Sequence, residues 1–186
     1  MNKKNLVYTV VILLTALAIG AGVYFKKDSQ PENNILAKDD FSISVPQGWQ
    51  ETQAPTGVSA IVVNASEEIT DPAAQEVNFR SYLSVSRDSL KGKSKEEYIE
   101  DVKSSLGQLS PTVNFTEDKQ IMVGEKEAEA MEVEITQQEV NFKVLLVLVW
   151  GEGEDVWVMG FNTTEDKWNE YSSLFYQIAA TFQIKK

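Results

Sequence analysis

The stretch that decides the fold is "NFKVLLVLVWGEGEDVWVMGFNT", Asn141 to Thr163. Its first ten and last nine residues are apolar on both faces of a strand, and a short acidic link with two glycines joins them. Half-exposed strands alternate apolar and polar residues, whereas unbroken apolar runs need cover on both sides. We therefore expect two central strands of a sheet, with other elements packed on each face.

Outward from this stretch, shorter segments show the alternation of half-buried strands. Met131, Val133 and Ile135 point to one side and are separated by polar residues. Further strands are expected at 58–63, 79–87 and 113–123. Residues 64–78 are expected to form a surface loop that turns at Asp71-Pro72.

Two segments carry apolar residues at helical spacing. Ser94 and Glu97 have the spacing of a capping box at the start of the first helix. Apolar residues then recur at Tyr98, Val102, Leu106 and Leu109, and in the last helix at Trp168, Tyr171, Phe175, Ile178 and Phe182. The expected fold class is α+β, with a central antiparallel sheet covered by helices on both faces.

The segment "FSISVPQGWQ", Phe41 to Gln50, combines a strand with its end. Phe41, Ile43 and Val45 share one face of the strand. Pro46 cannot donate to a strand ladder, and the glycine two residues later gives the chain freedom to turn. Trp49 is then expected to fold its ring back against the sheet.

Lys38 to Ile184 resembles the PsbP-like family in four features. These are a strand that ends in Pro-x-Gly-Trp, a capped helix, two apolar strands and a closing aromatic helix. The resemblance implies an α/β/α sandwich. The family's namesake is an extrinsic subunit of the photosynthetic oxygen-evolving complex, and many bacterial relatives are membrane-attached or exported proteins of unknown role. Some members use histidine in cation-linked functions, and this chain has none. The resemblance thus implies the fold and not the photosynthetic role.

The amino terminus predicts a membrane anchor. Leu6 to Phe25 is a run of 20 residues without a charge, with two lysines on each side. About 20 apolar residues span a hydrocarbon core of about 30 Å. A cleavable signal peptide is the alternative, because "ALA" at 16–18 fits a cleavage site, but the run continues seven residues beyond it. A bacterial lipid anchor is excluded, since the chain has no cysteine.

The sequence divides into a cytoplasmic end at 1–5, a transmembrane anchor at 6–25, a tether at 26–38 and a PsbP-like domain at 39–186. Four of the 17 basic residues flank the anchor, so 13 remain against all 28 acidic residues, a net charge of −15 beyond residue 27. This charge argues against nucleic acid as a partner. The lysines flanking the anchor are balanced, the α-amino group adds a weak inward bias, and long domains cross largely regardless of charge. We expect the domain on the extracytoplasmic side of the cell membrane.

Carboxylates are the main candidates for chemistry. Without histidine and cysteine, Ser-His-Asp and Cys-His catalysis and thiolate or imidazole metal sites are excluded. Glu152, Glu154 and Asp155, in the acidic loop Gly151 to Asp155, either bind Ca²⁺ or form a solvated hairpin turn. A second group of acids consists of Glu125, Glu127, Glu129, Glu132 and Glu134. These glutamates either serve glycoside or proton chemistry or form a charged face that protects a sheet. The four tryptophans are either a ligand platform or, as we expect, mainly core.

The sequence assigns no catalytic, cofactor-binding or metal-binding residue, and no cofactor is expected. We expect a non-enzymatic, membrane-tethered, extracytoplasmic binding or assembly module with a protein partner in the envelope. Two alternatives stay open. A carboxylate-dependent envelope hydrolase needs two carboxylates about 5–10 Å apart in a cleft. A structural accessory subunit of a membrane complex needs an apolar surface patch above a few hundred Å².

The orientation of the anchor can be tested because the chain has no native cysteine. In intact cells, a membrane-impermeant maleimide should label Ser29→Cys in the tether and leave Asn2→Cys unlabelled. The reverse pattern would place the domain in the cytoplasm. Labelled Ser29→Cys found only on protein released into the medium would show that the segment is a cleaved signal.

Overall fold

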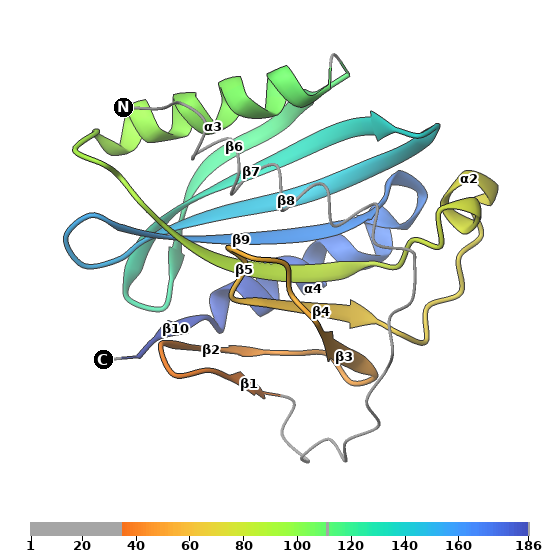
Figure 1. Cartoon of the computed structure of the whole chain (residues 1–186), viewed down its shortest axis with the longest axis horizontal. Helices are drawn as coiled ribbons and strands as arrows, with labels where there is room; N and C mark the ends of the chain where they lie inside the picture. The colour runs from red at the N-terminus through yellow and green to blue at the C-terminus, as the bar shows by residue number, and fades with distance from the viewer. Residues whose placement is uncertain (1–34, 111, 186) are drawn as a thin grey trace.

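The computed structural model describes residues 35–110 and 112–185, and its main feature is a seven-stranded antiparallel sheet (Figure 1). The order across the sheet is β3-β4-β5-β9-β8-β7-β6. The strands are β3 Trp49–Thr52, β4 Ala60–Asn64, β5 Tyr82–Ser89, β6 Asn114–Val123, β7 Lys126–Gln137, β8 Val140–Trp150 and β9 Asp155–Thr164. The two apolar strands, β8 and β9, pair with each other in the interior of the sheet, as their sequence predicted.

Alternate side chains of β8 and β9 enter two separate cores, one on each face of the sheet. Leu145, Val147 and Met159 point to one core. Leu146 and Val158 point to the other. The two faces are therefore both covered, which is why these strands carry no polar alternation.

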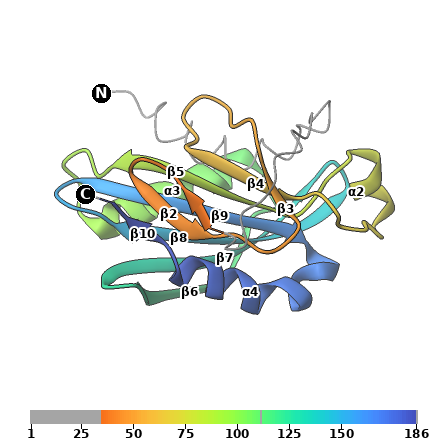
Figure 2. The same ribbon diagram turned by 90° about the horizontal axis from the view of Figure 1, so that it is seen from below.

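Helix α4, Trp168–Ala180, covers the first face (Figure 2). It follows a short 3₁₀ turn, η2 Glu165–Lys167. Phe175 lies at the centre of this core, with its ring 5.3 Å from the ring of Phe161 and 5.4 Å from that of Tyr171. The aromatic spacing in the sequence thus predicted the helix and its buried face for Trp168 to Ile178. It was wrong for Phe182, which lies beyond the end of the helix at Ala180 but is buried in the same core.

A second, three-stranded sheet lies on the same face, with the order β1-β2-β10. Its strands are β1 Ile35–Ala37, β2 Phe41–Ser44 and β10 Gln183–Ile184. The expectation that residues 26–38 form only a tether was wrong for 35–37, because this segment pairs with β2 and its Leu36 packs on the core. The small sheet joins the start of the domain to its carboxyl end.

The "FSISVPQGWQ" segment connects the two sheets. Phe41 and Ile43 are buried in β2 as predicted, but β2 belongs to the small sheet. Beyond Pro46 the chain turns at Gly48, whose φ of 85° favours glycine, and Trp49 opens β3 at the edge of the large sheet. The Trp49 ring packs edge-on against Tyr171 and Phe175 of α4, so it joins the edge of the large sheet to the helix.

Helix α3, Lys95–Leu109, lies on the opposite face, together with the short helix α2, Pro72–Glu76. The predicted capping box is present, since Ser94 and Glu97 each accept a hydrogen bond from the other's backbone N–H. The loop expected at 64–78 was wrong in part, because Asp71 does not form a simple turn. Its carboxylate caps the start of α2 by accepting hydrogen bonds from the next two non-proline backbone N–H groups.

The predicted anchor at 6–25, the cytoplasmic end at 1–5 and most of the tether lie outside the described residues. Within residues 35–110 and 112–185, no helix has both the length and the apolar character of a membrane span.

Replacing Ser94 with alanine should reduce the free energy of unfolding by about 1 kcal/mol, because one backbone N–H of α3 loses its acceptor. Urea denaturation followed by tryptophan fluorescence measures this change. Ser104→Ala, at an exposed position in the same helix, is the control and should change stability by less than about 0.5 kcal/mol. Equal losses in both variants would contradict the role of the cap.

Candidate functional site

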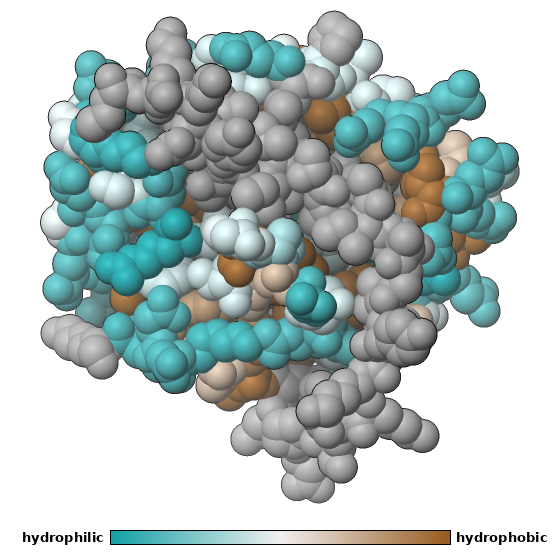
Figure 3. All heavy atoms as spheres, in the orientation of Figure 1, coloured by the Kyte–Doolittle hydropathy of each residue, from teal (hydrophilic) through white to brown (hydrophobic). Residues whose placement is uncertain are grey.

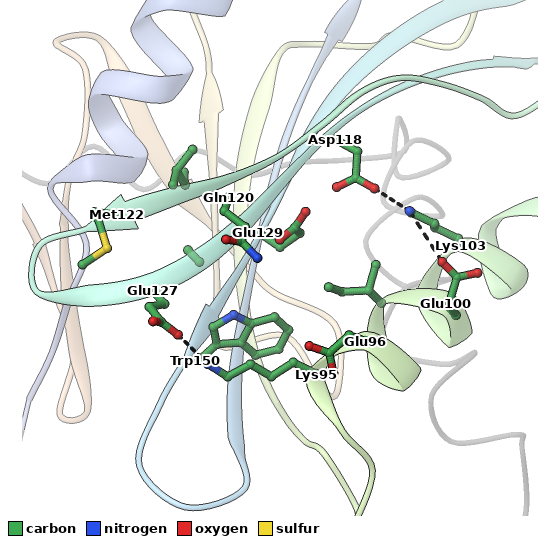
Figure 4. A pocket seen from close by; sticks show the side chains of 13 residues that line it. Lys95, Glu96, Glu100, Lys103, Asp118, Gln120, Met122, Glu127, Glu129 and Trp150 are labelled. Atoms are coloured by element: carbon green, nitrogen blue, oxygen red, sulfur yellow. Dashed lines mark hydrogen bonds and ion pairs between the residues drawn. The ribbon is translucent and has the colours of Figure 1, made fainter.

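An open groove of about 690 Å³ separates α3 from the β6–β7 hairpin (Figure 4). Its volume is in the usual range of ligand pockets. The ring of Trp150, at the end of β8, borders the groove near the start of α3. The charged side chains around it are Lys95, Glu96, Glu100 and Lys103 from α3, and Asp118, Glu127 and Glu129 from the hairpin.

Local geometry places these side chains in the groove. Lys95, Ile99 and Lys103 are four residues apart in α3 and therefore lie on one side of the helix. In β6 the pairing with β7 shifts between Phe115 and Glu117, at a β-bulge. The extra residue reverses the alternation of the strand, so that the side chain of Asp118 faces α3.

Glu129 and Asp118 form a carboxyl pair in this groove. Glu129 is only 9% exposed, and its carboxyl is in hydrogen-bonding contact with that of Asp118. Burial, and next the contact with Asp118, raise the pKa of Glu129 to about 7. The hydrogen bond from Glu129, and next the ion pair with Lys103, lower the pKa of Asp118. Within this pair, Glu129 therefore holds its proton more tightly than Asp118 does.

A second carboxyl pair lies on the other face of the same hairpin. Glu132 is buried under α4, and its carboxylate accepts a hydrogen bond from the Tyr176 hydroxyl at 3.1 Å. Burial, and next the contact with Glu117, raise the pKa of Glu132. Lys143 lies 3.6 Å from the Glu132 carboxylate and 5.1 Å from the centre of the Trp168 ring. This pair is tied into the packing of α4, on the face of the hairpin opposite to the groove.

The five glutamates predicted as a group do not form one cluster. Glu127 and Glu129 point to α3, Glu132 and Glu134 point to the α4 side, and Glu125 lies in the exposed turn of the hairpin. The interpretation as a solvated face was wrong for Glu129 and Glu132, because both are buried. Their partners Asp118 and Glu117 were not predicted, and the signal that identifies them is the register of β6 against β7.

The geometry of the carboxyl pair does not match that of a glycoside hydrolase. Such enzymes hold their two carboxyl groups about 5–9.5 Å apart, with room for a nucleophilic attack or a water molecule. Asp118 and Glu129 are in direct contact, and Lys103 occupies the remaining side of Asp118. In the described segments, no group of three or more acidic side chains is arranged to hold a metal ion.

The acidic loop between β8 and β9 is a hairpin turn. The backbone N–H of Gly151 donates to the carbonyl oxygen of Asp155 at 2.9 Å. The Asp155 carboxylate pairs with Arg87 of β5, and the Glu154 carboxylate accepts a hydrogen bond from Ser89 at 3.3 Å. These acids turn toward β5, so the structure does not bring them together as a calcium loop would require.

The tryptophans are core residues, as expected. Trp49, Trp157 and Trp168 are buried in the core under α4. Trp150 is buried in the core under α3 and also lines the groove. The ammonium group of Lys95 lies 5.5 Å from the centre of the Trp150 ring.

Comparison with known proteins finds similarity at the level of the fold. Neither a family model nor a curated protein sequence matches the chain. The solution structure of cyanobacterial PsbP (CyanoP) from Synechocystis sp. PCC 6803 matches with a TM-score of 0.61 and 16% identity, over 89% of this chain and 99% of that one. The described part of the chain therefore has a PsbP-like, sheet-dominated α+β fold, as the resemblance implied.

Two further solved structures share this fold. LpqN, involved in cell envelope biogenesis of Mycobacterium tuberculosis, matches with a TM-score of 0.57 and 13% identity, over 89% of this chain and 100% of that one. The Saccharomyces cerevisiae Ran-binding protein Mog1p matches with a TM-score of 0.56 and 13% identity, over 84% of this chain and 96% of that one. These identities show a common fold and leave the function to the geometry of the site.

The raised pKa of Glu129 predicts a specific pH dependence of stability. Between its ordinary pKa of 4.5 and about 7, the folded state binds more protons than the unfolded state, so the free energy of unfolding falls as pH rises through this range. Glu129→Gln removes this loss. Between pH 5 and pH 8, the free energy of unfolding of the variant relative to that of the native protein should therefore rise by about 1 to 2 kcal/mol, a value reduced for solvent screening.

Urea denaturation at a series of pH values measures the difference. Glu127→Gln, on the same side of the same strand, is the control, because Lys95 lowers the pKa of Glu127 and that group titrates below this range. A difference between native protein and Glu129→Gln that stays constant from pH 5 to pH 8 would show that Glu129 titrates normally.

Proposed function

We propose that this chain is a non-catalytic binding or assembly module, tethered to the cell membrane through residues 6–25, with its domain on the extracytoplasmic side. The observation that carries the proposal is the groove between α3 and the β6–β7 hairpin. Its two lysines pair with acids that line it, Lys95 with Glu127 and Lys103 with Glu100 and Asp118. Such a surface is suited to recognising a partner by charge and shape.

The membrane location rests on the uncharged run in the sequence and on the length of the domain that follows it. Two proteins of the same fold are compatible with the proposal. LpqN is involved in cell envelope biogenesis, and Mog1p binds Ran. We extend from them only the idea that this fold serves as a binding module, in this case in an envelope.

A purely structural accessory role is less well supported. Such a subunit would need a continuous apolar surface. Among the described residues, the large hydrophobic side chains that remain exposed are Ile35 and Met122, which belong to different sheets. The face of the molecule in Figure 3 shows hydrophobic residues scattered among hydrophilic ones.

The proposal predicts a protein partner that contacts the groove. A photoreactive amino acid introduced in place of Gln120, which is exposed and lines the groove, should crosslink one reproducible envelope protein in living cells. The same substitution at Ser173, exposed on α4, is the control and should not capture that protein. Mass spectrometry identifies the crosslinked product. Absence of a product from position 120, or the same products from both positions, would contradict the proposal.

A further inference from the structure

Lys95 occupies a position at which the dipole of its own helix disfavours a positive charge. It is the first residue of α3, where the positive end of the helix dipole favours acids and disfavours a cation. The next two residues, Glu96 and Glu97, are of the favoured type. The helix itself therefore gives no reason for a lysine at this position, and the reason lies in what its side chain contacts.

The Lys95 side chain crosses the groove and ends in a site built from other elements (Figure 4). Its ammonium group lies 5.5 Å from the centre of the Trp150 ring and 2.7 Å from a carboxylate oxygen of Glu127. An aromatic face next to a carboxylate is a site for an organic cation. Lys95 fills this site from within the molecule, so it stands in for a ligand cation of the same chemistry.

The contact of Lys95 with Glu127 can be exchanged easily. The side chains of Lys95 and Glu127 are 41% and 74% exposed, and an ion pair so open to solvent contributes little to stability. The second lysine that crosses the groove differs, because Lys103 and Asp118 are 26% and 33% exposed and Asp118 is also bonded to Glu129. We therefore assign Lys103 to holding α3 on the hairpin and Lys95 to an exchangeable contact.

We propose that the groove binds an extended, cationic segment of a protein partner, and that an arginine or lysine of this segment replaces Lys95 on Trp150 and Glu127. The inference deepens the proposed function and rests on it, since it names the chemistry of the partner at the same groove. Five carboxyl side chains and two lysines line the groove, so it is complementary in charge to a basic segment.

The dimensions of the groove fit a short peptide. Lys95 and Lys103 are eight residues apart in α3, which corresponds to about 12 Å along the helix. Three to four residues of extended chain, at about 3.3 Å each, cover this length. Ile99 on the helix and the exposed Met122 on the hairpin supply apolar contacts for the rest of the segment. A guanidinium group suits the site best, because it both stacks on an aromatic ring and pairs with a carboxylate.

The test uses the full chain in detergent micelles and a labelled, acetylated and amidated hexapeptide, Ala-Leu-Ala-Arg-Leu-Ala. A matched peptide carries neutral citrulline in place of arginine. Fluorescence anisotropy gives the affinity. The indole N–H resonance of Trp150 in the NMR spectrum, assigned with Trp150→Phe, reports the place of binding. The arginine peptide should bind at least about 5-fold more tightly than the citrulline peptide and should shift the Trp150 signal.

Two substitutions should change this affinity in opposite directions. Lys95→Met frees the site and should tighten binding of the arginine peptide by about 3- to 10-fold, whereas Glu127→Gln should weaken it by a similar factor. Lys93→Met and Glu139→Gln are the matched controls, because Lys93 pairs with Asp101 and neither residue lines the groove. Both controls should leave the affinity unchanged.

Equal binding of the two peptides, or an unchanged affinity in both Lys95→Met and Glu127→Gln, would overturn the inference. The two proposals can be contradicted separately. If a partner is crosslinked from position 120 but the arginine and citrulline peptides bind equally, the chain is still a binding module and the cationic segment is ruled out. If both experiments fail, both proposals are wrong.

Discussion

The fold depends on one constraint, which is that β8 and β9 are apolar on both faces and must be covered on both. On one face the cover is α4 with the small sheet, and aromatic rings fill the space between them. On the other face it is α3 with α2. Phe175, fully buried among the rings of α4 and β9, and Tyr98 of α3 mark the centres of these two contacts. Each helix is held mainly by the apolar area it removes from water.

The groove arises where this cover ends. The β6–β7 hairpin lies at the edge of the sheet, and its side chains change there from apolar to acidic. Acids that point toward the helices lose part of their hydration, which raises the pKa of Glu129 on one face and of Glu132 on the other. Glu129 contacts Asp118, which pairs with Lys103. Glu132 contacts Glu117 and pairs with Lys143, so each buried acid has polar partners on the hairpin or on a neighbouring element.

The lysines of α3 connect packing with recognition. Lys103 pairs with Asp118, whose side chain is 33% exposed, and so links the helix to the hairpin across the groove. Lys95 rests on Trp150, a residue that belongs to the core under α3 and also forms the end of the groove. A ligand at this position would therefore contact a ring that the core itself holds in place, and such preorganisation favours binding.

The sequence by itself determined the elements whose causes are local. The unbroken apolar runs of β8 and β9, the capping box at Ser94 and the aromatic spacing of α4 each depend on residues a few positions apart. Only the tertiary structure decided how distant segments meet. Ile35–Ala37 pairs with β2, and both strands belong to a separate small sheet, which no alternation within "FSISV" could indicate. The β-bulge in β6 turns Asp118 toward Glu129, and the register of the hairpin is a property of two strands together. Lys95 and Trp150 are 55 positions apart, and only the packing of α3 on the sheet brings the ammonium group to the ring.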